Sequence, residues 1–318
     1  MSPALFADPP PPFAAELGPR LRALASQGVY FGTSSWKYEG WLGQIYTPAR
    51  YAYRGRLSAK RFQDGCLAEY AATFPVVCGD FTFYQFPSEP YWRKLFTSAS
   101  ASLLYALKVP EDITVRVFPT HARYGARGGR VNDSFLDAGL LRDAFLRPLE
   151  PYRGQVAALI FEFGAFPKQA YDGPGPFVRD LDDFLAKLPA GYRYSVEIRN
   201  PEFLGPEYFG CLRRHNVAHV FNAWARMPAL SSQIALREAF TADFTLARAL
   251  LKQGRAYANA VDLFQPYDRI QEENPQGREA LRQLARRARD TGQPAFLFVN
   301  NRFEGNAPGT IAAITAEL

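Results

Sequence analysis

A carboxylate and a guanidinium end one apolar stretch near the middle of the chain. Residues 194–198 are mostly apolar, but Glu197 and then Arg199 close the stretch before a turn at Pro201. Side chains on one face of a β-strand recur at every second residue, so Glu197 and Arg199 point the same way. Such a pair is either a structural ion pair, because an unpaired buried charge is costly, or part of a ligand site. Both interpretations are open at this point.

Most other apolar runs also end in side chains that ionise or form hydrogen bonds, and the starts of the runs show much less of this. These side chains are Trp36, Asp80, Tyr84, Lys108, Glu162, Asn222, Arg248, Asn300 and Asn301. Polar residues occur by chance wherever a strand meets a loop. The presence of both charge signs nevertheless favours one shared site.

The charged members of this set suggest a division of roles. Glu197 and Glu162 are candidates for a general acid or base. Lys108 is a candidate base or amine nucleophile, if burial and nearby guanidinium groups lower its pKa. Arg199 and Arg248 can hold a carboxylate or a phosphate through paired hydrogen bonds. We therefore name Glu197 and Lys108 as catalytic candidates.

The remaining candidates are assigned to substrate binding, through hydrogen bonds to hydroxyl groups or an oxyanion, or through stacking on a flat ring. They comprise Trp36, Asp80, Tyr84, Glu162, Asn222, Asn300 and Asn301. For each aromatic residue, ordinary core packing is the competing interpretation.

Metal and cofactor motifs are weak. Three widely spaced cysteines form no CxxC pair, and His215 and His219 straddle the start of a predicted strand. We therefore predict no cofactor, no disulfide framework and no Cys/His metal site, and we expect a cytoplasmic location. An oxygen-ligated divalent ion at Glu162 and Glu197 stays open.

The fold that must position these residues follows from eight apolar runs separated mostly by helical patterns. The runs are 29–36, 75–84, 103–109, 156–161, 194–198, 217–221, 243–248 and 295–299. Continuous apolar runs are typical of parallel strands covered by helices. Eight of them predict an α/β fold of the (β/α)8 TIM-like barrel type, in which sites lie at the C-terminal mouth. A doubly wound open sheet is the alternative, but no GxGxxG follows the first run.

The chain reads as a single barrel domain over residues 29–318, preceded by an extended lead-in over residues 1–28. Its 47% hydrophobic content is enough for a large core. No apolar run approaches the roughly 20 residues of a membrane span, and no signal peptide is predicted at the N-terminus. Long loops over 110–130 and 223–242 are expected at the mouth, where loops of this length are often functional.

Several motifs, in order along the chain, resemble those of the YecE-like proteins, the family called domain of unknown function 72. The resemblance rests on Gly32–Trp36 with Trp41 and Tyr46, on 82–84 with 87–88, on Lys108, and on 196–201, 243–248 and 299–308. It implies a TIM-like barrel and no established activity. Three positions depart from the pattern of many members: Cys78-Gly79-Asp80, Asn222 and Leu250-Leu251. These departures put acid–base catalysis by the usual residues of the family in doubt.

Two hypotheses about function follow. The first is an enzyme, a hydrolase, lyase or isomerase, acting on a small anionic or polyhydroxylated substrate. The second is a non-catalytic binding or accessory protein for a phosphate-rich ligand or nucleic acid. The formal net charge of +6 is compatible with both, and no membrane partner is expected.

Overall fold

Eight parallel strands close into a barrel in the computed structural model, which describes residues 9–167 and 169–318. The strands are β1 (Val29–Thr33), β4 (Val76–Gly79), β5 (Leu104–Lys108), β6 (Val156–Phe163), β7 (Tyr194–Ile198), β8 (Ala218–Ala223), β9 (Thr245–Ala249) and β10 (Ala295–Val299). Their order around the barrel is β1-β10-β9-β8-β7-β6-β5-β4. Each strand falls within or overlaps one predicted run, so the (β/α)8 prediction is confirmed and the open sheet is excluded.

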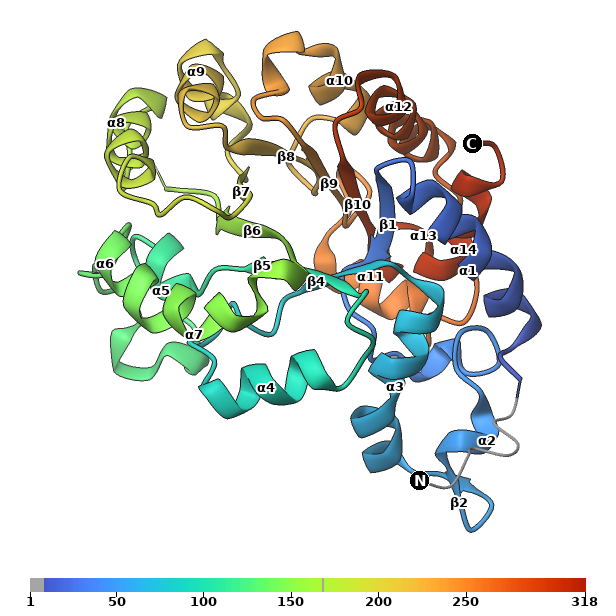
Figure 1. The fold of residues 1–318 in the computed structure, drawn as a ribbon. Helices are drawn as coiled ribbons and strands as arrows, with labels where there is room; N and C mark the ends of the chain where they lie inside the picture. The colour runs from blue at the N-terminus through green and yellow to red at the C-terminus, as the bar shows by residue number, and fades with distance from the viewer. Residues whose placement is uncertain (1–8, 168) are drawn as a thin grey trace.

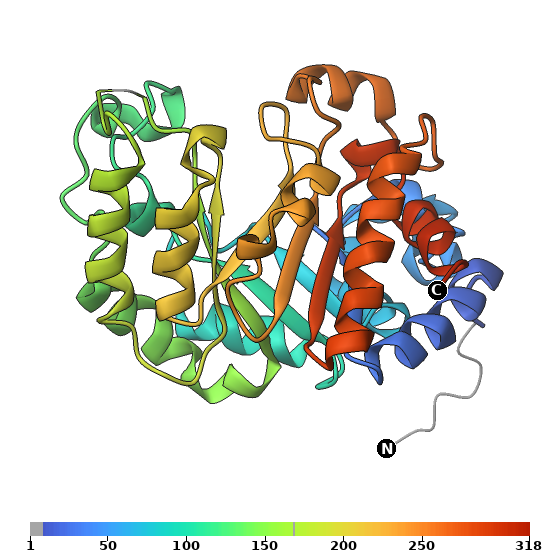
Figure 2. The same cartoon turned by 90° about the horizontal axis from the view of Figure 1, so that it is seen from above.

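Helices surround this barrel (Figure 1). The longer ones are α1 (Pro12–Ala25), α3 (Ala59–Thr73), α4 (Glu89–Thr97), α8 (Pro174–Leu185), α9 (Pro206–Arg214), α11 (Tyr257–Phe264), α12 (Pro275–Thr291) and α14 (Ala307–Thr315). Helix α8 shows why they form, because its apolar residues recur at helical spacing and Phe177, Leu181 and Phe184 are buried. Helix α12 lies against β10 on the outside of the barrel (Figure 2).

Shorter elements complete the chain between the strands. They are α2 (Pro48–Tyr51), the hairpin strands β2 (Ala52–Tyr53) and β3 (Arg56–Leu57), α5 (Glu111–Thr114), α6 (Ala138–Leu140), α7 (Arg147–Leu149), α10 (Leu230–Ala235) and α13 (Asn301–Glu304). A π-helical segment, Leu141–Leu146, joins α6 to α7. The long connections after β5 and β8 were predicted as loops, and they contain α5 and α10 respectively.

The strands divide their side chains between two apolar cores. One core fills the barrel and includes Cys78, Ala106, Ile160, Val220 and Phe298. The other lies between the strands and the helices. Side chains on one face of a strand recur at every second residue. The residue two positions after a barrel-filling side chain therefore also points inward, and at the strand end it lies at the mouth. This periodicity directs polar strand ends toward one another.

The N-terminal prediction is wrong in part. Residues 12–25 form helix α1 rather than an extended lead-in, and Leu17, Leu21 and Leu24 are buried against the barrel domain. Pro11 is extended, and a proline at the first helical position suits the start of a helix. Residues 1–8 lie outside the described part of the chain. None of the helices in the described part is both long and apolar enough to span a membrane.

Candidate functional site

Six charged side chains meet at the C-terminal mouth of the barrel, and we call them the ion network. The network consists of Asp80, Lys108, Glu162, Glu197, Arg199 and Arg248. They come from the ends of β4, β5, β6, β7 and β9, where the inward-pointing positions leave the apolar core. Three carboxylates and three cations make the network formally neutral. The convergence that the strand ends suggested is therefore present.

Lys108 anchors one side of the network. Its Nζ lies 2.7 Å from Glu162 Oε2 and 3.0 Å from Asp80 Oδ1. The Lys108 main chain is also held, because the Thr82 hydroxyl donates to its carbonyl oxygen at 2.5 Å. The ammonium group also lies 5.0 Å from the centre of the Phe83 ring. Lys108 is therefore fixed in position and facing two carboxylates.

The two arginines join the remaining carboxylates. Arg199 lies 3.0 Å from Glu162 Oε1 and 3.1 Å from Glu197 Oε1. Arg248 contacts Glu162 at 2.7 Å, Asp80 at 3.2 Å and also Glu197. Strand register explains part of this arrangement, because Glu162 and Glu197 are paired neighbours on β6 and β7. Both guanidinium groups thus have carboxylate partners within the protein.

Burial differs sharply across the network. The Asp80 side chain is 39% exposed, and that of Arg199 is 15% exposed. Lys108 and Glu162 are buried, and Glu197 and Arg248 lie deepest. A ligand entering from solvent would therefore meet Asp80 and Arg199 first, with Lys108 just beneath.

The structure corrects the expectation for Lys108. Burial alone lowers the pKa of a lysine, but attraction to Glu162 and Asp80 outweighs that effect and raises the pKa of Lys108 above its ordinary value. The ammonium form is therefore stabilised, which opposes the predicted roles of neutral base and amine nucleophile. A lysine that keeps its proton is instead suited to stabilise negative charge.

Glu162 and Arg248 are held in their charged forms. Burial on its own raises the pKa of Glu162, but Arg199, Lys108 and Arg248 together shift that pKa well below its usual range. Burial opposes the charge of Arg248 in the same way, while Glu197 and other acidic neighbours raise its pKa well above the ordinary value. Glu162 and Arg248 are thus fixed charges at neutral pH.

Asn222 contributes an amide beside the network. Its register partner on β9 is Arg248. The Asn222 Nδ2 donates to the carbonyl oxygen of Ile198 at 3.1 Å, whereas its Oδ1 has no hydrogen-bond partner within the described residues. The Nε of Arg248 is likewise buried and unpartnered there. Both atoms are available to a polar group placed between these strands.

Asn300 and Asn301 serve the chain itself. The Asn300 side chain accepts a hydrogen bond from the Arg302 backbone at 2.9 Å and caps α13. Asn301 Oδ1 accepts one from the Ala307 backbone at 2.8 Å. Both sit at the end of β10, as predicted, but their carbonyl oxygens already hold the loop in place.

The predicted aromatic residues separate into core and surface. Trp36 is buried and packs edge-on against Phe81 at 5.5 Å, which agrees with ordinary packing. Tyr84 is 54% exposed, and the guanidinium of Arg123 lies 4.6 Å from its ring centre. Within the described part of the chain, no hydrogen bond or ring contact joins either side chain to the ion network.

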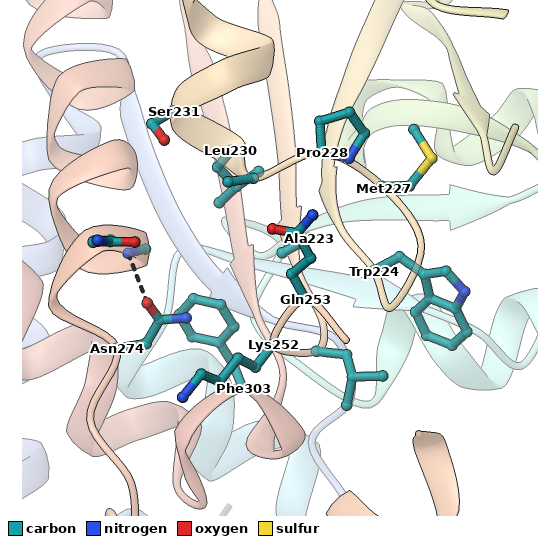
Figure 3. A pocket seen from close by; sticks show the side chains of 14 residues that line it. Ala223, Trp224, Met227, Pro228, Leu230, Ser231, Lys252, Gln253, Asn274 and Phe303 are labelled. Carbon is teal, nitrogen blue, oxygen red and sulfur yellow. Dashed lines mark hydrogen bonds between the residues drawn. The ribbon is translucent and has the colours of Figure 1, made fainter. Parts of the chain in front are cut away.

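Figure 3 shows the side chains that line a cavity of about 200 Å³ beyond the ends of β8 and β9. Its lining includes Trp224, Lys252 and Asn274, and none of the six network residues. The two features share one boundary, because the Arg199 guanidinium stacks on Trp224 at 3.9 Å. We place the candidate site on the network rather than in the cavity, since the ionisable groups that can move protons converge there.

The residues of the network do not suit a metal ion. Within the described residues, no group of three or more His, Cys, Asp or Glu side chains is placed to hold one. At Glu162 and Glu197, all four carboxylate oxygens contact arginine or lysine nitrogens. A divalent ion there would have to displace those cations. His215 is engaged with Asp182 at 2.7 Å, and His219 is buried beside Tyr208.

Sequence reasoning did not single out Tyr38, Trp224 and Arg302 as candidate residues at the mouth. Tyr38 follows β1, Trp224 follows β8 and Arg302 follows β10, so all three lie in connections at the mouth. They stand one to five residues beyond the strand ends. The search for polar residues considered only the last residues of each run, and a wider window would have included them.

A closed (β/α)8 barrel with a buried ion network at its mouth defines the structural class of this protein. The profile of the family described as "Protein of unknown function DUF72" matches residues 30–318, and the chain belongs to that family. The match extends over nearly all of the predicted barrel domain, in agreement with the resemblance seen in the motifs.

Two solved structures share the fold. A DUF72 family protein from Thermotoga maritima has a TM-score of 0.58 and 18% identity, covering 91% of this chain and 98% of its own. A DUF72 family protein from Enterococcus faecalis has a TM-score of 0.60 and 14% identity, with coverages of 91% and 96%. No match was found among curated proteins.

Proposed function

We propose that the protein is an enzyme that transfers protons on a small polyhydroxylated substrate, in a hydrolase, lyase or isomerase reaction. The observation that carries this proposal is the ion network itself, placed where sites of this fold lie. A core of apolar residues would stabilise a barrel at least as well as buried ion pairs do. Retaining six charges at the mouth is therefore better explained by chemistry.

Within the network, Asp80 and Lys108 are the best placed pair. Asp80 is the most exposed carboxylate, and it lies 3.0 Å from Lys108 Nζ. We assign Asp80 as the proton acceptor and protonated Lys108 as the group that stabilises a developing oxyanion. Glu197 is fully buried and held by both arginines, so its role is to position Arg248 and Arg199.

The test uses a variant that should fold normally. Purified protein is incubated in D2O with a panel of aldoses, ketoses, aldonic acids and sugar phosphates, and proton NMR spectra report deuterium incorporation or new products. We expect Asp80→Asn to lower the rate at least about 100-fold, as loss of a general base does. The stability cost should be smaller than that of removing a fully buried carboxylate, because Asp80 is 39% exposed and both of its cationic partners keep other carboxylates.

Asp64→Asn is the matched control, because Asp64 is also an exposed carboxylate paired with a lysine, Lys94, at 3.3 Å. Its rate should equal that of the unaltered protein. Equal rates for Asp80→Asn and the control, or no turnover of any compound by the unaltered protein, would count against this function.

A second candidate function is binding of single-stranded nucleic acid at the β2–β3 hairpin. Tyr53 is 51% exposed, and the guanidinium groups of Arg54 and Arg61 lie 5.3 and 4.9 Å from its ring centre. Exposed rings beside cations suit stacked bases and phosphates. Binding of an oligonucleotide would then weaken steeply with salt, and a flat response would exclude it.

A further inference from the structure

The ion network leaves little positive charge for an anionic substrate. Arg199 and Arg248 were expected to hold a carboxylate or phosphate, but each already contacts two or more carboxylates. Binding an anion there would mean breaking those ion pairs. Any anionic group on the substrate therefore needs a different cation at the same mouth.

Arg302 is such a cation. It is the second residue of α13, three residues beyond the end of β10, and it is half-buried. Among residues 9–167 and 169–318, its guanidinium has neither a carboxylate within ion-pair distance nor a hydrogen-bond acceptor. The group lies over the Tyr257 ring, 4.4 Å from its centre. Stacking of this kind holds a guanidinium in place while leaving its N–H edges available.

Tyr38 supplies a second donor from the neighbouring strand. β1 pairs with β10, and Tyr38 follows β1. Its ring packs against Trp41 at 4.9 Å and Tyr267 at 5.5 Å, while its hydroxyl makes no hydrogen bond within the described residues. The Tyr38 ring is therefore rigidly placed, with a free polar end.

Close backbone packing fixes this position further. A Cβ at Gly40 would lie 2.1 Å from the Pro266 carbonyl oxygen, so only glycine allows the segment after β1 to approach residues 266 and 267. Tyr267 is in turn tied to the segment after α13, because Asn306 Nδ2 donates to its carbonyl oxygen at 2.8 Å. The two segments that carry Tyr38 and Arg302 are thus joined through Tyr267.

Electrostatics agree with this geometry. Burial raises the pKa of Tyr38 to about 12, and Arg302 exerts the largest charge effect on it, followed by Asp80. The Tyr38 hydroxyl therefore remains a donor at neutral pH, and the charges of Arg302 and of Asp80, at the exposed end of the ion network, both act on it. The Asp80–Arg248 ion pair passes from β4 to β9, across the ends of β1 and β10.

We propose that Arg302 and the Tyr38 hydroxyl bind an anionic group of the substrate, a carboxylate or a phosphate, beside the ion network. This assignment rests on the proposed function and adds its substrate class: a small polyhydroxylated acid or phosphate ester. The anionic group would be held at the β1–β10 side, so that the reacting carbon lies over Asp80 and Lys108.

The test measures anion binding without any turnover. Inorganic phosphate and D-gluconate are titrated separately at constant ionic strength, and calorimetry and thermal unfolding report the affinity. The unaltered protein should bind at least one of the two, and the better probe identifies the group. Arg302→Gln should weaken that binding at least about 10-fold, and Tyr38→Phe about 5-fold, as loss of a charged and a neutral hydrogen bond does.

Arg287→Gln is the matched control, because Arg287 also stacks on a ring, Phe240, at 3.9 Å, but on the outer helix α12. Its affinity should not change. If Arg302→Gln fails to fold, Tyr38→Phe and Arg302→Lys carry the test, and the lysine variant should retain part of the binding. No binding of either probe, or equal binding by all variants, overturns the assignment. The proposed function is tested separately, by the loss of proton transfer in Asp80→Asn, because the binding experiment involves no turnover.

Discussion

Individual charges in the ion network depend on one another, and Glu162 is the centre of that dependence. It contacts Lys108, Arg199 and Arg248, which together shift its pKa well below the usual range. A carboxylate with a lowered folded-state pKa stabilises the protein above its unfolded-state pKa, about 4.3, and this stabilisation is lost as the pH falls toward the folded value. The free energy of unfolding should therefore fall at acid pH.

Glu162→Gln should make that sensitivity visible. At pH 7 the change leaves three buried cations with one carboxylate fewer, so we expect a loss of about 3–5 kcal/mol in the free energy of unfolding. Below pH 4.5 the difference from the unaltered protein should shrink, because the Glu162 carboxyl takes up a proton in the unfolded chain while it stays ionised in the folded protein. Urea unfolding between pH 7 and pH 3 measures both quantities. If the two free energies of unfolding differ by the same amount at every pH in this range, Glu162 is not the source of the acid sensitivity.

Most members of the network could be predicted from sequence, because both the charge and the strand-end position of Lys108, Glu162, Glu197 and Arg248 are visible there. Their protonation could not. The direction of the Lys108 pKa depends on two carboxylates, one from β6 and one from beyond β4, that reach its Nζ only in the folded barrel. Arg302 was missed because its lack of an acidic partner is a property of the fold and not of its neighbours in sequence.

Secondary-structure elements at the mouth are held by a second buried ion pair. Glu304, at the end of α13, is fully buried and accepts hydrogen bonds from Arg278 Nε at 2.9 Å and from Thr310 Oγ1 at 2.7 Å. Arg278 belongs to α12 and Thr310 to α14. One carboxylate therefore joins three helices directly beneath the turn that carries Arg302.

Removing that charge should affect the whole helix cluster. We expect Glu304→Gln to lower the free energy of unfolding by about 3–5 kcal/mol, because buried Arg278 would keep only the exposed Glu273, at 3.4 Å, as a partner. Glu279→Gln is the control, since Glu279 pairs with Arg282 and Arg286 but is 41% exposed, and its cost should stay under about 1 kcal/mol. Chemical denaturation of both variants measures the difference. Similar costs for the two would mean that burial does not set the strength of these pairs.

The strands and principal helices could be predicted from apolar periodicity, and the exceptions have local causes. The second run was expected to extend through Tyr84, but β4 ends at Gly79, and Phe81 folds back so closely that a Cβ at Gly79 would lie 2.3 Å from its ring. Helix α1 was missed because four consecutive prolines dominate the sequence before it. Proline is favourable at the first position of a helix, so the last of these prolines could equally have predicted a helix start.

The molecule as a whole is a closed cylinder, and closure is what brings distant residues together. Asp80 and Arg248 are 168 residues apart, yet they lie 3.2 Å from each other because their strands belong to one ring. A prediction of eight parallel strands implies contacts between residues that are far apart in sequence, but it does not specify which side chains form them. The barrel architecture could therefore be anticipated, and the pairing within the network only in outline.

The most direct measurement is a crystal structure with the best substrate of the NMR panel bound to Asp80→Asn protein. The account predicts that the ligand lies at the barrel mouth, with an oxygen within hydrogen-bond distance of Lys108 Nζ and its reacting carbon beside residue 80. A ligand seated instead in the cavity lined by Trp224, Lys252 and Asn274, with Lys108 untouched, would contradict it.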